Sequence, residues 1–139
     1  MGTGSEVDLC VKAGARLREL GVPARVVSMP SWEIFYEQSP EYRESVLPAA
    51  VRKRVTVEAA STFGWEKFAG LDGCIIGIDQ FGASAPATEI MARFGFTAQH
   101  VTAAALQLMG RFEDAKRESA RDEKETTAVA ATSSTEGHS

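Results

Sequence analysis

The residues that come nearest to a phosphate-binding site lie between an apolar segment and an expected helix. Residues 77–84 read GIDQFGAS, which can be compared with the phosphate-loop pattern G-x-x-x-x-G-K-[ST]. Gly77, Gly82 and Ser84 match, but Ala83 stands where the pattern has lysine. The loop therefore lacks the positive charge that faces the β- and γ-phosphates. A structural turn is the favoured interpretation, with Gly82, Ala83 and Ser84 as a weak candidate anion site at a helix start.

Other side chains capable of catalysis or metal binding are scattered along the chain. Glu58 and Asp79 follow expected strands, where α/β proteins form their sites, but no histidine, lysine or metal ligand accompanies them. Cys10 and Cys74 lie in apolar patterns and are interpreted as buried free thiols, with a disulfide or redox pair as the minor alternative. His100 has no metal-ligand spacing to them. We predict no catalytic, cofactor-binding or metal-binding residue in this chain.

The composition limits the classes of protein to consider. With 139 residues and 44% hydrophobic content, the chain is long enough for one domain with its own core. Its net charge is −4 and no basic cluster is interleaved with aromatic residues, so a nucleic-acid surface is not expected. No apolar run approaches the roughly 20 residues of a membrane span, and no signal peptide is recognised. We expect a cytoplasmic protein that contacts neither nucleic acid nor membrane.

The elements that would hold these residues alternate between helices and strands. Capping residues and apolar spacing predict helices near 7–20, 32–37, 41–47, 85–94 and 97–112, and strands at 25–29, 54–58 and 74–78. The predicted helix N-caps are Ser5 (in a capping box with Asp8), Ser31, Ser39, Ser84 and Thr97. This alternation is typical of an α/β fold with a mainly parallel sheet.

The connecting segments are rich in aromatic residues, for which we expect core or subunit-contact roles. These residues are Trp32, Phe35, Tyr36, Phe63, Trp65 and Phe68. The α/β domain is predicted to span residues 1–112. Residues 113–139 form a charged tail that becomes rich in Ala, Ser and Thr, and we expect it to be partly helical and then disordered.

Six stretches in order give a more specific resemblance. They are TGSEV at 3–7, RVVSMPSWE at 25–33, YRESVLP at 42–48, VEAASTFGW at 57–65, IGIDQFGASAP at 76–86 and FGFT at 94–97. Together they closely resemble the C-terminal domain of transketolase, from Thr3 to about Arg111. The resemblance implies a three-layer α/β/α fold.

The resemblance also implies a function that the residues alone did not indicate. Transketolase uses thiamine diphosphate and Mg²⁺ to move two-carbon ketol units between sugar phosphates in the pentose phosphate pathway. Its first two domains bind the cofactor at the dimer interface, and the third, which this chain resembles, holds no cofactor ligand. The resemblance therefore carries no catalytic or cofactor residue onto this sequence.

The start of the chain departs from the family pattern. In the family, an apolar strand near the middle of a five-stranded sheet precedes the TGSEV stretch, whereas here Met1 and Gly2 stand in its place. We therefore expect the fold without its first strands. Either the sheet closes up, or another chain supplies the strand, or the polypeptide is marginally stable.

The expected function is a structural and subunit-contact domain of a transketolase, inactive alone. Its expected partners are a second chain carrying the cofactor-binding domains, or a second copy in a homodimer. One alternative is a free-standing regulatory module that binds an anion or nucleotide at the Ser84 helix start. The other is a nonfunctional transketolase fragment.

Overall fold

A computed structural model describes residues 1–60, 62–77 and 95–133. In chain order the elements are α1 (Glu6–Glu19), α2 (Trp32–Glu37), α3 (Pro40–Val46), β1 (Val55–Glu58), α4 (Glu66–Ala69), β2 (Cys74–Gly77), α6 (Ala98–Leu108) and α7 (Phe112–Ser133). The predicted helix at 85–94 and the cap at Ser84 lie outside the described residues.

The strands β1 and β2 form a parallel pair, with Val57 opposite Ile76. Because side chains alternate along a strand, Val57 and Ile76 point to one face and Ile75 points to the other. Val57 and Ile76 pack among residues of α1 and α6, whereas Ile75 packs on the cluster of Trp65 and Phe68. The sheet is therefore covered by helices on both faces, as the predicted α/β fold class requires.

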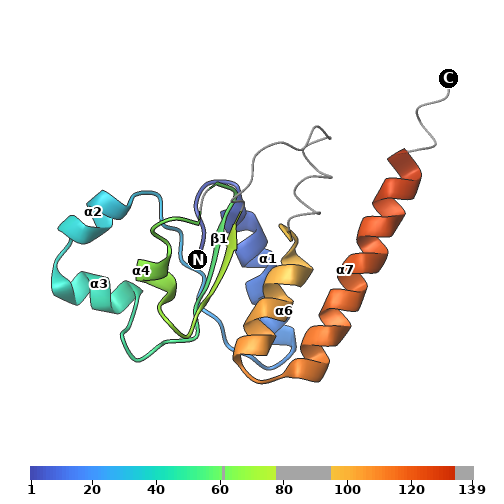
Figure 1. The fold of residues 1–139 in the computed structure, drawn as a ribbon. Helices are drawn as coiled ribbons and strands as arrows, with labels where there is room; N and C mark the ends of the chain where they lie inside the picture. The colour runs from blue at the N-terminus through green and yellow to red at the C-terminus, as the bar shows by residue number, and fades with distance from the viewer. Residues whose placement is uncertain (61, 78–94, 134–139) are drawn as a thin grey trace.

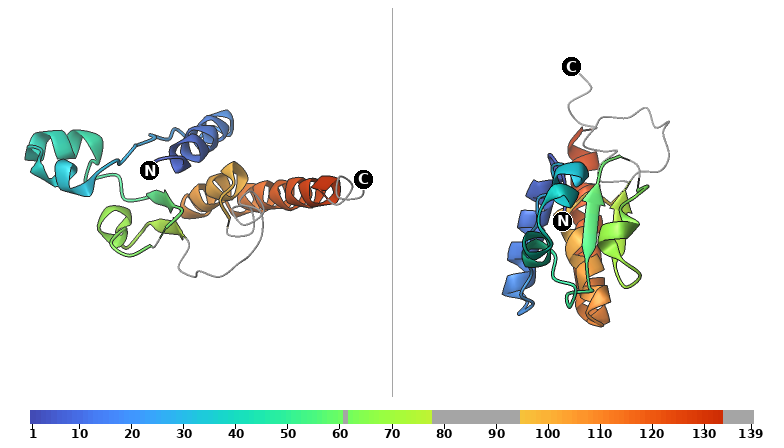
Figure 2. Two further views of the ribbon diagram at one scale, coloured as in Figure 1. Left: turned by 90° about the horizontal axis from the view of Figure 1, so that it is seen from above. Right: turned by 90° about the vertical axis from the view of Figure 1, so that its left-hand side faces the viewer.

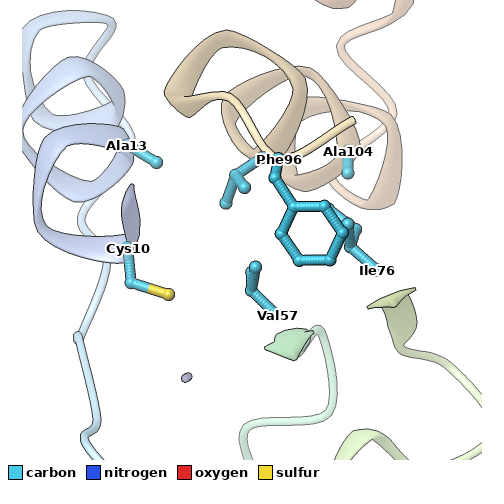
Figure 3. Packing of buried hydrophobic residues seen from close by; sticks show 7 residues of the cluster. Cys10, Ala13, Val57, Ile76, Phe96 and Ala104 are labelled. Atoms are coloured by element: carbon cyan, nitrogen blue, oxygen red, sulfur yellow. The ribbon is translucent and has the colours of Figure 1, made fainter. Parts of the chain in front are cut away.

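Figures 1 and 2 show how the helices are distributed around this small sheet. Helices α1 and α6 lie together against one face, and α7 packs on the outer side of α6. Helix α4 contacts both strands, and α2 and α3 project at the end of the molecule away from α7. The main core lies between the sheet and α1 and α6, where Cys10, Val57 and Phe96 converge (Figure 3).

The segment 25–29 is not a strand, which corrects the sequence prediction. Only Ser28 pairs there, in a single parallel bridge with Gly2, and Gly2 also bridges Val57 of β1. The amide of Gly2 donates to the carbonyl of Val27 at 3.1 Å. A strand needs a neighbour along its length to satisfy its backbone groups, and in the described chain only Gly2 pairs with this segment. The N-terminal residues thus occupy a position between 25–29 and β1.

The local capping predictions have different outcomes. The hydroxyls of Ser31, Ser39 and Thr97 each accept a backbone N–H in the first turn of α2, α3 and α6, which confirms these caps. The Ser5 cap is wrong. Ser5 already has helical backbone angles, and its hydroxyl donates to the carboxylate of Glu6 at 2.8 Å instead of accepting an amide.

Helix α7 covers most of the charged tail, through Ser133. Ala115 and Glu118 are buried, whereas the described side chains beyond Asp122 are exposed. The first turns of α7 therefore belong to the packed structure, and its later turns project from it (Figure 1). Residues 134–139 lie outside the described part of the chain, and the division into a domain and a tail stays a prediction.

Candidate functional site

The weak anion site predicted from sequence lies outside the described residues. Gly82, Ala83 and Ser84 fall in the range 78–94, so the structure does not test that hypothesis. Gly77 does lie inside β2, where a Cβ atom would come within 2.4 Å of Cγ2 of Thr62. Glycine at position 77 is therefore explained by close packing.

The carboxylate at the C-terminal end of β1 is engaged in structural hydrogen bonds. Oε2 of Glu58 accepts from the hydroxyl of Thr3 at 2.8 Å, and Oε1 accepts from the amide of Ala60 at 3.2 Å. Asp79, the other carboxylate singled out in the sequence, lies outside the described residues. Glu58 thus fixes the turn after β1 and the start of the chain.

The two cysteines are free thiols, as the sequence predicted. Cys10 is buried and Cys74 is half-buried. Burial raises the pKa of both thiols, which keeps them protonated and unreactive at neutral pH. Among the residues that the structure describes, no three His, Cys, Asp or Glu side chains gather in a way that could hold a metal ion.

The described residues form an apolar groove with a volume of about 320 Å³. Met1, residues 22–27 and residues 53–55 contribute to its lining. Residues of α1 and α6 line one side, among them Ala13, Leu17, Val101 and Ala105, and Val46, Leu47 and Val51 also contribute. We call this hollow the apolar groove.

Met1 and Gly2 take part in a ladder of backbone hydrogen bonds, and Met1 also lines the apolar groove. The amine of Met1 donates to the carbonyl of Val55 at 2.6 Å, and its carbonyl accepts from the amide of Val57 at 2.9 Å. The amide of Met29 donates to the carbonyl of Gly2 at 2.9 Å. Sequence reasoning noticed the shortened start but did not find this pairing, because bridges between positions so far apart have no local signal.

Comparison with known proteins decides the family. The family model described as the transketolase-like C-terminal domain matches residues 1–97, which is more than half of the chain. This chain belongs to that family.

The relatives agree with this assignment. Transketolase 10 of Craterostigma plantagineum is 56% identical over 108 residues, covering 78% of this chain and 16% of its own length. The transketolase of Nostoc is 51% identical over 110 residues, covering 79% of this chain and 16% of its own length. A solved transketolase from Leishmania mexicana superimposes with a TM-score of 0.72 and 43% identity, covering 80% of this chain and 16% of that one.

The chain therefore corresponds to the C-terminal domain of transketolases and spans about 16% of the length of these relatives. The resemblance and the α/β fold predicted from sequence are both confirmed. Helix α7, from Phe112 onward, lies beyond the residues that the transketolase family model matches.

The aromatic set of this transketolase domain divides between core and surface. Trp65 and Phe68 are buried, and Trp32 meets Trp65 edge to face with ring centroids 5.3 Å apart. Tyr36 stacks on Phe68 at 5.8 Å while remaining 45% exposed. We call Trp32, Trp65 and Phe68 the aromatic core, and its contacts pack α2 against α4.

Three apolar or aromatic side chains of α2 and α3 are exposed to solvent. Ile34 and Tyr36 of α2 and Tyr42 of α3 are all largely exposed. We call these three residues the α2–α3 surface.

Proposed function

We propose that this chain acts as the structural and subunit-contact C-terminal part of a transketolase and has no ketol-transfer activity alone. The observation that carries the proposal is the family match over residues 1–97 together with the short share of each relative that the chain covers. The ketol transfer between sugar phosphates then takes place on domains that lie outside these 139 residues.

The residues that the structure describes do not fit the cofactor and its metal ion. Thiamine diphosphate in this family comes with Mg²⁺, which prefers oxygen ligands such as carboxylates. In the described part of the chain, no group of acidic residues, histidines or cysteines is arranged to hold a metal, and Glu58 is already bonded to Thr3 and Ala60. We therefore propose that the cofactor and Mg²⁺ bind to the cofactor-binding domains of the enzyme.

The α2–α3 surface supports a contact role. Apolar and aromatic side chains that are exposed together are typical of surfaces that bind another protein. Ile34 is 61% exposed, and Tyr36 is 45% exposed while its ring stacks on Phe68. Because Tyr36 is already held against the buried Phe68, it loses less conformational entropy when it binds a partner. We propose that this surface contacts the cofactor-binding domains of a second chain, or a second copy in a homodimer.

The test mixes the 139-residue chain with a polypeptide that carries the cofactor-binding domains, and measures complex formation by sedimentation. We expect a stable complex, no ketol transfer by the 139-residue chain alone, and about tenfold weaker assembly for Ile34→Glu. Val129→Glu is the matched control, because Val129 is 62% exposed on α7. Absence of a complex, or equal weakening by both variants, contradicts the proposed contact surface.

Neither alternative from the sequence gains support from the family comparison. A free-standing anion-binding module depends on residues 82–84, which lie outside the described structure. Titrating the chain with nucleotides and sugar phosphates separates that module from a transketolase domain, since only the module predicts saturable micromolar binding. A nonfunctional fragment predicts that no complex forms with the cofactor-binding domains.

The cellular compartment is also a proposal. None of the described helices is long and apolar enough to cross a bilayer. Several relatives carry the word chloroplastic in their names. We propose a cytoplasmic location for this chain, and fluorescence microscopy of the tagged protein in its own cells tests it.

A further inference from the structure

We propose that a pocket between α2, α3 and α4 binds a small aromatic oxyanion, that is, an aromatic ring that carries a phosphate or a carboxylate group. The pocket has a volume of about 310 Å³, which is at the lower end of the range of small-molecule sites. Residues of all three helices line it, and these helices lie at one end of the molecule (Figure 1). We call it the α3–α4 pocket, and its described lining includes Tyr36, Arg43, Glu44, Lys67 and Phe68.

The first observation is that the guanidinium of Arg43 has no partner in the described part of the chain. It forms no ion pair and no side-chain hydrogen bond there, and its Nε is buried. A guanidinium has several N–H donors, and a buried donor without an acceptor costs free energy. An oxyanion bound by the two Nη atoms would offset the positive charge of this half-buried group.

The second observation concerns the acidic residue of the described lining, Glu44, which does not neutralise Arg43. Both of its carboxylate oxygens accept from the backbone amide of Ala49, at 3.0 and 3.2 Å. Lys67 of α4 also lines the pocket, is exposed, and forms no ion pair with any described residue. Arg43 and Lys67 therefore leave an excess of positive charge at the pocket, which attracts an anion.

The third observation is that Arg54 holds part of the pocket wall in place. Its Nε donates to the carbonyl of Val51 at 2.7 Å. Its Nη1 donates to the carbonyl of Phe68 at 3.0 Å, and its Nη2 donates to the carbonyl of Pro48 at 2.8 Å. These bonds connect α4 to the segment that follows α3. Because the wall is already held together, less conformational entropy is lost when a ligand binds.

The fourth observation is that aromatic rings lie beside these cations. Phe68 is 2% exposed, and the ring of Tyr36 stacks on it with centroids 5.8 Å apart. Tyr36 is 45% exposed, so it still presents apolar surface to a ligand. Phe35 also lines the pocket and meets Phe68 edge to face at 6.0 Å. A ligand with a flat ring and a negative group would contact both the rings and the cations.

The test titrates the 139-residue chain with phenyl phosphate, and in a second titration with benzoate, while two-dimensional NMR follows the backbone amides. We expect saturable shifts in α2, α3 and α4, with binding in the millimolar range. Inorganic phosphate has the charge without the ring and should bind about fivefold more weakly than phenyl phosphate. Benzyl alcohol has the ring without the charge and should bind at least about tenfold more weakly.

A set of variants checks the location. Arg43→Gln removes the unpaired guanidinium and should weaken the binding of phenyl phosphate at least about tenfold. Lys67→Gln removes an exposed charge and should weaken it about threefold. Arg117→Gln is the matched control, because the side chain of Arg117 is 77% exposed on α7, and it should leave binding unaltered. If Arg43→Gln does not fold, Lys67→Gln and the comparison of ligands still decide the matter.

Three outcomes overturn the proposal. One is the absence of saturable shifts with both phenyl phosphate and benzoate. Another is equal binding of phenyl phosphate and inorganic phosphate, or equal weakening by Arg43→Gln and Arg117→Gln, which indicates an adventitious ion only.

The third outcome concerns a different source of the same chemistry. If assembly with the cofactor-binding domains abolishes the binding of phenyl phosphate, and Arg43→Gln also weakens that assembly, the pocket holds a carboxylate side chain of the partner and not a free ligand. Because the titrations need neither ketol transfer nor a complex, failure of the proposed function leaves the first two outcomes interpretable.

Discussion

The guanidinium of Arg16 and the carboxylate of Glu118 join α1 to α7 although the two residues are 102 positions apart in the chain. Nε and Nη2 of Arg16 both donate to Oε1 of Glu118, at 3.0 and 2.6 Å, and the side chain of Glu118 is only 3% exposed. Oε2 of Glu118 is buried without a hydrogen-bond partner in the described part of the molecule. The buried charge therefore depends on Arg16, with Arg121 as a more distant second donor at 3.3 Å.

This dependence gives a prediction for stability. Arg16→Ala leaves the buried carboxylate of Glu118 with only the more distant guanidinium of Arg121 to offset its negative charge. We therefore expect the free energy of unfolding to fall by about 3 kcal/mol. In a double-mutant cycle with Glu118→Ala the coupling should reach about 1 kcal/mol or more. Chemical denaturation measures both values.

The exposed ion pair of Lys12 and Asp8 is the matched control for this cycle. Both side chains are more than 60% exposed, so its coupling should be about 0.3 kcal/mol. If the Lys12–Asp8 pair shows the same coupling energy as the Arg16–Glu118 pair, burial of Glu118 does not strengthen its ion pair.

The same pair predicts a pH dependence. Hydrogen bonds from Arg16 lower the pKa of Glu118 below its ordinary value of 4.5. A carboxylate whose pKa is lower in the folded state stabilises the protein above its unfolded pKa, and this contribution is lost as the pH falls through the folded pKa. The stability advantage of the parent chain over Glu118→Gln should therefore be constant above 4.5 and shrink at lower pH. Unfolding curves at a series of pH values test this, and a pH-independent difference contradicts it.

The aromatic core gives a prediction about packing. Phe68 is 2% exposed and lies within 6.0 Å, centroid to centroid, of Trp32, Phe35, Tyr36 and Trp65. We expect Phe68→Ala to lower the free energy of unfolding by about 4 kcal/mol, because it leaves a cavity between α2 and α4. Leu71→Ala removes a side chain that is 99% exposed and should change stability by less than about 0.5 kcal/mol. Thermal and chemical unfolding of both variants provide the comparison.

The tight contact at Gly77 can be tested with a rescue. A Cβ at this position would lie 2.4 Å from Cγ2 of Thr62, so Gly77→Ala should cost about 2 kcal/mol. Thr62→Ser removes that methyl group and keeps the hydroxyl, so combining it with Gly77→Ala should restore about half of the loss. If the double variant is no more stable than Gly77→Ala alone, the methyl contact is not the cause.

Helix α7 yields a prediction about truncation. The described side chains from residue 122 onward are mostly exposed, so deleting residues 122–139 should lower the melting temperature by no more than about 3 °C. Deleting residues 112–139 also removes Ala115 and Glu118 and uncovers Leu106, so a loss of about 4 kcal/mol is expected. Calorimetry of the two truncated chains separates the packed turns from the projecting ones. Equal melting temperatures would show that the packed turns contribute nothing.

Local signals in the sequence were sufficient for several elements. Ser31, Ser39 and Thr97 cap helices because an N-cap involves residues only three positions apart, and Pro40 reinforces the start of α3. The ordered motifs were sufficient for the family, since similarity is a property of the sequence itself. The candidate anion site at 82–84 was also a local pattern, but those residues lie outside the described structure.

The tertiary structure decided what depends on distant partners. Whether 25–29 becomes a strand depends on a neighbour, and in the described chain only Gly2 pairs with it, so β-propensity alone gave the wrong answer. The contact of Arg16 with Glu118 and the division of the aromatic residues between core and surface arise only when α1, α7, α2 and α4 have packed. The sequence by itself determined the family and the helix starts at Ser31, Ser39 and Thr97, because both depend on local patterns, and the packing of the chain determined which distant residues meet.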